Sequence, residues 1–228
     1  MKDFTKLEKK LNIDFKNKDL LTQAFCHRSY LNEKPNACLS HNERMEILGD
    51  AVLELIVTEY LYNNYDNPEG ELTNWRAVLV NSQNLAKISQ GLEFENYLLL
   101  SKGEKKDTGK ARQFILANTF EAFLGALYLD RGYKTVKKFI ESCLLPDLAK
   151  ILKKGDWKDC KSHFQEVAQE KFKITPSYKI LKQSGPDHNK CFISGVFLGD
   201  ELIAKGEGFS KQESEESAAK NGLDVKQW

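Results

Sequence analysis

The sequence predicts an all-α domain followed by a small α+β domain with the element order α-β-β-β-α. Three observations lead to this prediction. Apolar residues recur at helical spacing over residues 6–151, a polar run with a glycine occupies residues 152–156, and β-branched and aromatic residues gather in three short stretches beyond it. A chain of 228 residues is long enough to bury two modest cores. We therefore expect domains at residues 1–152 and 156–226.

The individual elements follow from local patterns. In the first domain the only clear breaks in the helical spacing are short, such as those at residues 63–70 and 102–109. In the second domain residues 158–172 predict one amphipathic helix, and Pro176 follows it. Three strands and a last helix complete the domain, with both helices expected on one face of an antiparallel sheet. The expected strands are 177–183, 191–198 and 201–208, and the last helix is 211–226.

The composition bounds the function without choosing it. The formal net charge is +1 and 29% of the residues are charged, so any nucleic-acid binding must come from local basic patches. Residues 1–21 alternate charged and apolar side chains and lack the continuous apolar stretch of a signal peptide or a membrane helix. We expect a soluble cytoplasmic protein that does not act at a membrane.

The cysteines predict reduced thiols rather than a disulfide framework or a zinc site. Their number is odd, and none of them has the C-x-x-C spacing of a zinc ligand pair. They are Cys26, Cys38, Cys143, Cys160 and Cys191.

Acidic residues interrupt a predicted helix that is otherwise apolar. Apolar side chains cover nearly the whole circumference of the helix at residues 41–57, which predicts that it is buried. Glu43, Glu46 and Asp50 fall at positions i, i+3 and i+7, so their carboxylates share one face. Burying unpaired carboxylates costs several kcal/mol, so this face requires cations nearby.

A second predicted helix repeats the pattern. Residues 114–128 are apolar almost throughout, except that Asn118 and Glu121 lie on one face. If the two polar faces meet, they form an all-oxygen site suited to Mg²⁺ or Mn²⁺.

Two other interpretations of these acids compete with a metal site. In the first, Arg44, His27 or Arg28 neutralises them in an ordinary buried ion-pair network. The second, a ferritin-like di-iron bundle, requires Glu-x-x-His pairs, and neither helix has a histidine three residues after a glutamate.

The helical half resembles the ribonuclease III family. Residues 42–52 (NERMEILGDAV) are similar to that family's signature motif, and the other matching pieces follow in the family's order. These pieces are HRS at 27–29, EGEL at 69–72, RAVLVN at 76–81 and ILANTFEA at 115–122.

The C-terminal half resembles a double-stranded-RNA-binding domain in motif order and in the α-β-β-β-α pattern. The matching pieces are QE at 165–166, PSY at 176–178, GPDH at 185–188, GEGFSK at 206–211 and AA at 218–219. Together the two resemblances imply a homodimer of the helical domain, with a valley in which the acids of each subunit cut one strand of an RNA duplex.

The family resemblance assigns roles to the acids. It implies metal-binding roles for Glu46, Asp50, Asn118 and Glu121, with Asp50 and Glu121 catalytic, and Mg²⁺ as the cofactor with Mn²⁺ as a substitute. Glu43 and Glu69 match auxiliary acids that line the valley. The family usually has aspartate at position 118, and the asparagine keeps a carbonyl oxygen but loses a charge, so we expect weaker metal affinity. Ile47 is a second departure, because the family often has an aromatic residue there that packs across the dimer.

Several residues are candidates for contact with RNA. Gln165, Glu166 and His188 could meet minor-groove 2′-hydroxyls, and Lys211 at the start of the last helix could meet phosphates. In the helical half, a glycine-containing loop just before residue 114 carries basic residues, which we expect to contact phosphate. Its principal members are Lys110 and Arg112, with Lys102, Lys105 and Lys106 preceding them.

The function implied is endonucleolytic cleavage of double-stranded RNA by Mg²⁺-dependent phosphodiester hydrolysis, in the processing of ribosomal and other structured RNA precursors. The alternative is a non-catalytic double-stranded-RNA-binding protein weakened by Asn118. The acids that remain argue against this alternative, because their burial would persist as a cost without a metal. A purely structural helical protein leaves the second domain unexplained.

Overall fold

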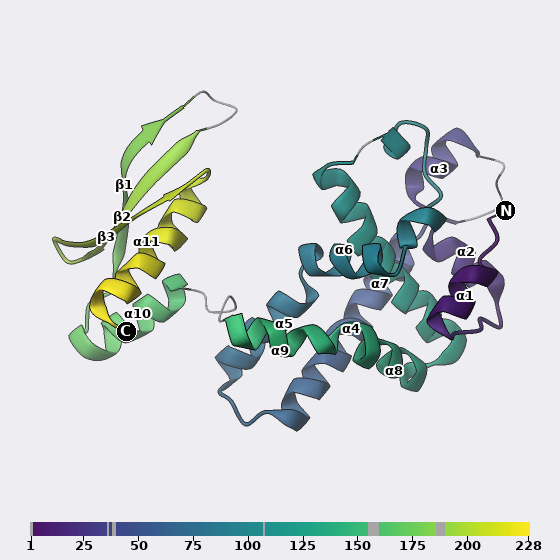
Figure 1. Cartoon of the computed structure of the whole chain (residues 1–228), viewed down its shortest axis with the longest axis horizontal. Coiled ribbons are helices and arrows are strands. Elements are labelled where there is room, and N and C mark those ends of the chain that lie inside the picture. The colour runs from purple at the N-terminus through teal and green to yellow at the C-terminus, as the bar shows by residue number, and fades with distance from the viewer. Residues whose placement is uncertain (1, 36, 38–39, 107, 155–159, 186–189) are drawn as a thin grey trace. The chain divides into compact units, whose positions relative to one another are not determined.

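The computed structural model of the chain describes residues 2–35, 37, 40–106, 108–154, 160–185 and 190–228 (Figure 1). Its contacts divide the chain into two compact units, Met1–Trp157 and Lys158–Trp228. Residue 156, where the sequence places the beginning of the second domain, lies outside the described residues.

The first unit is all-helical, as the sequence predicts. The two long helices α4 and α7 pack against each other, and α2, α6 and α8 pack against α7. The α-helices are α1 (Thr5–Leu11), α2 (Lys18–Ala24), α3 (Arg28–Glu33), α4 (Glu43–Asn64), α5 (Glu69–Val80), α6 (Ser82–Gly91), α7 (Lys110–Arg131), α8 (Tyr133–Cys143) and α9 (Leu148–Lys154). Three short 3₁₀ helices join them, η1 (Phe94–Tyr97), η2 (Glu104–Lys106) and η3 (Leu145–Asp147).

Two glycines allow α4 and α7 to touch through their backbones. A Cβ atom at Gly49 would lie 1.7 Å from the carbonyl oxygen of Glu121, and a Cβ atom at Gly125 would lie 2.2 Å from that of Met45. No side chain fits in either space, so only glycine permits this approach. The contact fixes the two helices at the level of the acids.

Interlocking phenylalanines form the core beneath this contact. Phe25, Phe94 and Phe123 are fully buried, with ring centroids 5.0 Å apart for Phe25 and Phe94 and 5.1 Å apart for Phe94 and Phe123. Buried aromatic pairs at such distances stabilise a core beyond the area that they bury. The aromatic cluster therefore supports α7 from the side away from solvent.

The second unit has the predicted α-β-β-β-α order. Its strands form an antiparallel sheet in the order β1-β2-β3; α11 packs on β2 and β3, and α10 packs on α11 (Figure 1). Gly206 permits close packing of α11 on β3, because a Cβ there would lie 2.0 Å from the Ala218 nitrogen. The elements are α10 (Cys160–Phe172), β1 (Ser177–Ser184), β2 (Cys191–Leu198), β3 (Glu201–Gly208) and α11 (Lys211–Lys226).

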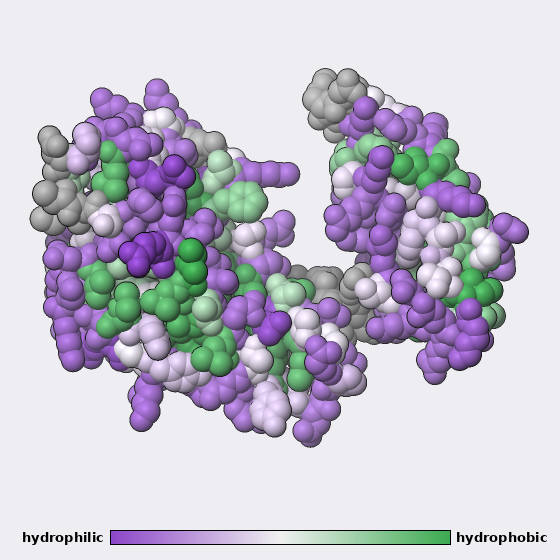
Figure 2. All heavy atoms as spheres, turned by 180° about the vertical axis from the view of Figure 1, so that it is seen from behind, coloured by the Kyte–Doolittle hydropathy of each residue, from purple (hydrophilic) through white to green (hydrophobic). Residues whose placement is uncertain are grey.

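Two sequence expectations about the first unit need correction. The stretch 152–156 is not wholly a linker, because α9 continues to Lys154 with Leu152 packed against the core. Nor is α4 buried all round: Ile47 is 72% exposed and Leu55 is 57% exposed. Figure 2 shows apolar side chains gathered on a face of the helical unit. The apolar circumference of α4 therefore exceeds what this chain covers by itself.

The structure places four of the five cysteines. Cys26, Cys143, Cys160 and Cys191 are free thiols, and Cys38 lies outside the described residues. Across the described ranges, no helix combines the length and the apolar character that a membrane span requires.

The glycine contact yields a stability prediction. Replacing Gly49 with alanine forces α4 away from α7, because the new methyl group meets backbone rather than a flexible side chain. We expect a loss of at least about 3 kcal/mol in the free energy of unfolding, at the upper end of overpacking effects. Denaturant unfolding of Gly49→Ala measures it. The control is Gly91→Ala at the end of α6, where a Cβ meets no atom within 4 Å; equal stability of the two variants would contradict the prediction.

Candidate active site

The contact between α4 and α7 brings polar side chains from both helices together. Glu46 lies one turn before Asp50 on α4, and Asn118 lies one turn before Glu121 on α7. The Asn118 side-chain amide lies close enough to the Glu46 carboxylate to lower its pKa, so side chains of the two helices face each other at this point. We call Glu46, Asp50, Asn118 and Glu121 the acid face.

The carboxylates of the acid face repel one another. Burial, followed by the negative charges of Asp50 and Glu46, raises the pKa of the Glu121 carboxyl to about 8. Burial and the charges of Glu43 and Asp50 likewise raise the pKa of Glu46, and the hydrogen bond from Asn118 partly offsets the rise. Both effects disfavour the ionised forms, so the site strongly favours a bound cation.

None of the described residues supplies a positive charge to the acid face. Within the described residues, no lysine, arginine or histidine forms an ion pair with Glu46, Asp50 or Glu121. Arg28 lies near Glu43 instead, with 3.5 Å between Nη1 and Oε1, and Arg44 is exposed. A buried ion-pair network therefore does not explain Glu46, Asp50 and Glu121.

The donor set of the acid face fits a hard divalent cation. Its carboxylates and the Asn118 carbonyl group offer oxygen as the ligand atom, which is the donor that hard divalent cations prefer. Asp50 is exposed, and Glu46 and Glu121 are half-buried, so the face is open to solvent. Over the described residues, however, no three or more His, Cys, Asp or Glu side chains are already gathered around an ion position. The oxygens are near one another but not closed into a cage.

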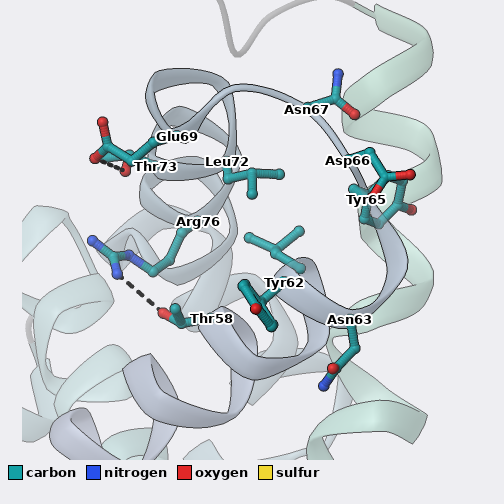
Figure 3. Close-up of a pocket in the computed structure, with 11 residues that line it drawn as sticks. Thr58, Tyr62, Asn63, Tyr65, Asp66, Asn67, Glu69, Leu72, Thr73 and Arg76 are labelled. Atoms are coloured by element: carbon teal, nitrogen blue, oxygen red, sulfur yellow. Dashed lines mark hydrogen bonds between the residues drawn. The ribbon is translucent and has the colours of Figure 1, made fainter.

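Glu69 lies in a different place. It is exposed at the start of α5, accepts a hydrogen bond from the Thr73 hydroxyl at 3.2 Å, and lines a cavity of about 790 Å³ between α5 and the end of α4 (Figure 3). The lining of this cavity, which includes Tyr62 and Arg76, contains no member of the acid face. Sequence spacing offered no signal for this cavity, because it depends on the turn between two helices.

The two principal members of the basic loop have different environments. Lys110 is exposed at the first position of α7. Arg112 is only 7% exposed; its Nη2 donates to the Glu104 carbonyl oxygen at 2.8 Å, and its Nε lies 3.7 Å from Oε1 of Glu95. Arg112 therefore binds groups of the protein itself rather than presenting its charge to solvent. Of these two residues, only Lys110 is exposed as the expected phosphate contact requires.

The candidate RNA contacts of the second unit lie on its surface. Gln165 and Glu166 are exposed on α10, and Lys211 is exposed at the first position of α11. Ser210 caps α11 by accepting a hydrogen bond from the Glu213 nitrogen at 3.1 Å, and the Glu213 carboxylate accepts one from the Phe209 nitrogen at 2.8 Å. His188 lies outside the described residues.

Comparison with known proteins shows which family the chain belongs to. Residues 17–148 match the family model described as Ribonuclease-III-like, and residues 160–226 match the model of the double-stranded RNA binding motif. The chain belongs to the ribonuclease III family. It is therefore a double-strand-specific endoribonuclease whose RNA-binding domain follows its nuclease domain along the chain. The resemblance found in the sequence is confirmed.

Relatives match over almost the whole chain. The curated protein named Ribonuclease 3 from Oceanobacillus iheyensis is 45% identical over 226 residues, which cover 97% of both chains. Ribonuclease 3 from Borreliella burgdorferi is 43% identical over 220 residues, or 96% of this chain and 89% of that protein. The solved nuclease domain of ribonuclease III from Campylobacter jejuni covers 63% of this chain and 97% of its own, with 36% identity and a TM-score of 0.57.

The raised pKa of Glu121 predicts how stability depends on pH. Between its ordinary pKa of 4.5 and the folded value of about 8, the folded state holds a proton that the unfolded state has released. Without divalent metal, the free energy of unfolding should therefore fall as pH rises across this window and level off above it. Glu46, whose pKa is also raised, contributes in the same direction.

Denaturant unfolding in a chelator between pH 5 and pH 9 measures this dependence. Glu121→Gln removes the titrating group and should flatten the curve, whereas Glu141→Gln, at an exposed position of α8, should leave it as in the unchanged chain. A curve that rises with pH over this window, or that Glu121→Gln does not alter, would show that the carboxyl is ionised in the folded state.

Proposed function

We propose that this chain hydrolyses both strands of duplex RNA at the acid face, with Mg²⁺ as the natural cofactor and Mn²⁺ as a substitute. One observation carries the proposal: three carboxylates and an amide oxygen meet where the described residues provide no positive charge, and burial and mutual repulsion raise the pKa of Glu121 to about 8. Ribonuclease III enzymes generally depend on a divalent metal, which is consistent with this site.

The residues of the acid face have distinct tasks. Asp50, Glu46 and Glu121 would hold the metal through carboxylate oxygens, with Asp50 and Glu121 closest to the chemistry. Asn118 lowers the pKa of Glu46 and so favours its ionised form, and it would offer its own carbonyl oxygen as a further ligand. When bound, a divalent metal supplies an activated water and stabilises the departing 3′-oxygen, so no nucleophilic side chain is needed.

The remaining candidates serve recognition. Duplex RNA is read mainly by shape, through 2′-hydroxyls in its shallow minor groove and phosphates along its edges. Gln165, Glu166 and His188 would meet the minor grooves, and Lys211 and Lys110 would meet phosphates. The Glu213 carboxylate beside Lys211 keeps this phosphate contact modest and sensitive to salt.

We also propose that the helical units form a homodimer. Ile47 and Leu55 on α4 and Phe114 and Leu129 on α7 are more than half exposed, so each long helix has apolar side chains that its own chain does not cover. The solved Campylobacter jejuni nuclease domain is described as flexible in a region involved in dimer formation. A second copy would cover these side chains and could bring Glu43 and Glu69 to one valley as auxiliary acids.

Structured RNA precursors, including those of ribosomal RNA, are the proposed substrates, and the cytoplasm is the proposed location. The asparagine at position 118 favours one alternative, a duplex-binding protein that has lost cleavage. The same experiment separates the two.

Cleavage of a labelled, fully paired RNA in Mg²⁺ tests the nuclease. We expect cutting of the duplex but not of a single-stranded control, and a loss of at least about a hundredfold in kcat for Glu121→Gln with duplex affinity retained, because the substitution removes a metal ligand. Asn118→Asp should lower the Mg²⁺ concentration at half-maximal rate, since it adds a negative ligand. Glu141→Gln is the matched control.

The outcomes divide cleanly. Binding without cutting by the unchanged chain, with cutting by Asn118→Asp alone, would establish the non-catalytic alternative. No cutting by any version would exclude the proposed chemistry.

Sedimentation of Ile47→Asp tests the dimer. A carboxylate at a position that is 72% exposed costs little in a monomer but a great deal in an apolar interface, so we expect a shift from dimer to monomer with a folded chain by circular dichroism. The matched control is Val225→Asp in the second unit, where the side chain is 64% exposed. A dimer that persists in Ile47→Asp would place the interface elsewhere.

A further inference from the structure

The HRS motif at residues 27–29 has no role in the chemistry described so far. The structure places it at the start of α3, next to the segment 101–106 that precedes α7. We call residues 101–106 the lysine segment, because Lys102, Lys105 and Lys106 are all exposed on it. Among the described residues these three lysines form no ion pair with a carboxylate, so their charges are available to an external anion.

A chain of hydrogen bonds joins the motif to the lysine segment. The Ser101 nitrogen donates to the Ser29 hydroxyl at 3.1 Å, and the Ser29 oxygen lies 2.8 Å from Nδ1 of His27. The Ser29 nitrogen also donates to Nδ1, at 3.3 Å, so this nitrogen is the acceptor and the hydroxyl donates to it. The hydroxyl of Ser29 is therefore used on both sides and is fixed in one orientation.

Two further contacts hold the same segment. The Glu33 carboxylate at the end of α3 accepts from the Lys102 nitrogen, with both oxygens within 3.1 Å. Arg112 donates to the Glu104 carbonyl oxygen at 2.8 Å from its buried position on α7. All three contacts are made to the backbone of the segment, so the lysine side chains stay free of them.

The HRS motif also contacts α4, the helix that carries Glu46 and Asp50. Arg28, between His27 and Ser29, approaches Glu43 to 3.5 Å, and Glu43 is close enough to Glu46 to raise its pKa. One short helix therefore touches the acid-bearing helix with one residue and the lysine segment with the next. Through α3, the lysine segment is therefore linked to the acid-bearing helix.

We propose that Ser29, Glu33 and Arg112 are positioning residues that hold the lysine segment in register with the acid face, so that its lysines bind the phosphates of the RNA duplex during cleavage. The inference rests on the proposed function and deepens it by assigning a task to the HRS motif. None of the three residues touches RNA. Each acts through the backbone of a segment that does.

Steady-state cleavage of a duplex RNA by Ser29→Ala and Glu33→Gln tests the proposal. We expect KM to rise by about three- to tenfold, the effect of losing one hydrogen bond, with kcat within about twofold of the unchanged chain. The dependence of log kcat/KM on log salt should become less steep by about one for each phosphate that the variant no longer binds. Ser29→Thr retains the hydroxyl and should restore KM.

A double-mutant cycle separates positioning from general destabilisation. In a chain with Lys102, Lys105 and Lys106 all changed to alanine, Ser29→Ala should raise KM no further, because there is no phosphate-binding lysine left to misplace. The control Ser142→Ala removes a hydroxyl that donates to the Phe139 carbonyl oxygen within α8, and it should leave KM unchanged in both backgrounds. If Ser29→Ala raised KM by the same factor in the triple-alanine chain, the proposal would be overturned. A fall in kcat at unchanged KM would overturn it as well.

A second readout does not depend on cleavage. Amide hydrogen exchange at Ser101 and Lys102 should accelerate in Ser29→Ala and Glu33→Gln, and the dissociation constant for duplex RNA should rise in parallel. If the unchanged chain binds but does not cut, the proposed chemistry fails while these measurements still decide the positioning role. Unchanged exchange and unchanged duplex affinity in both variants would refute it.

Discussion

The backbone contact between α4 and α7 is the constraint on which the site depends. Because Gly49 and Gly125 have no Cβ, the two helices approach until backbone meets backbone, and Asn118 on one helix then lies close enough to Glu46 on the other to lower its pKa. The aromatic cluster beneath α7 holds this approach from the core side. If the helices stood a side chain further apart, the carboxylates would regain water and lose the mutual repulsion that makes them a cation site.

The repulsion among these carboxylates lowers the stability of the folded chain. Half-buried carboxyls whose pKa values are raised destabilise the ionised folded chain, and the large apolar core of the helical unit offsets this. A rigid arrangement of negative oxygens needs little rearrangement to receive a cation, which is how preorganised sites gain their electrostatic effect. The same feature therefore lowers the stability of the metal-free chain and, in the proposed function, would prepare it for metal-dependent chemistry.

Among the described residues, the lysines of the lysine segment form no ion pair with the acid face. The acids occupy the α4–α7 contact, while Lys102, Lys105 and Lys106 stand on a segment tied to α3 and α7 through backbone hydrogen bonds. In the proposed function, this separation would let a polyanion and a divalent cation bind side by side without the lysines neutralising the acids.

The sequence by itself determined the two-domain order, the positions of the strands and the pairing of acids on two helix faces, because each of these follows from local spacing at a period of 2 or 3.6. Tertiary structure decided what spacing cannot report. Periodicity shows that a helix is apolar all round but not whether its own chain covers it, which is why Ile47 is exposed. A run of basic residues does not show which of them turns inward, and only the packed structure commits Arg112 to the Glu104 carbonyl. Distances between elements depend on the packing of side chains from the whole core, and a local sequence pattern does not report the combined effect of those contacts.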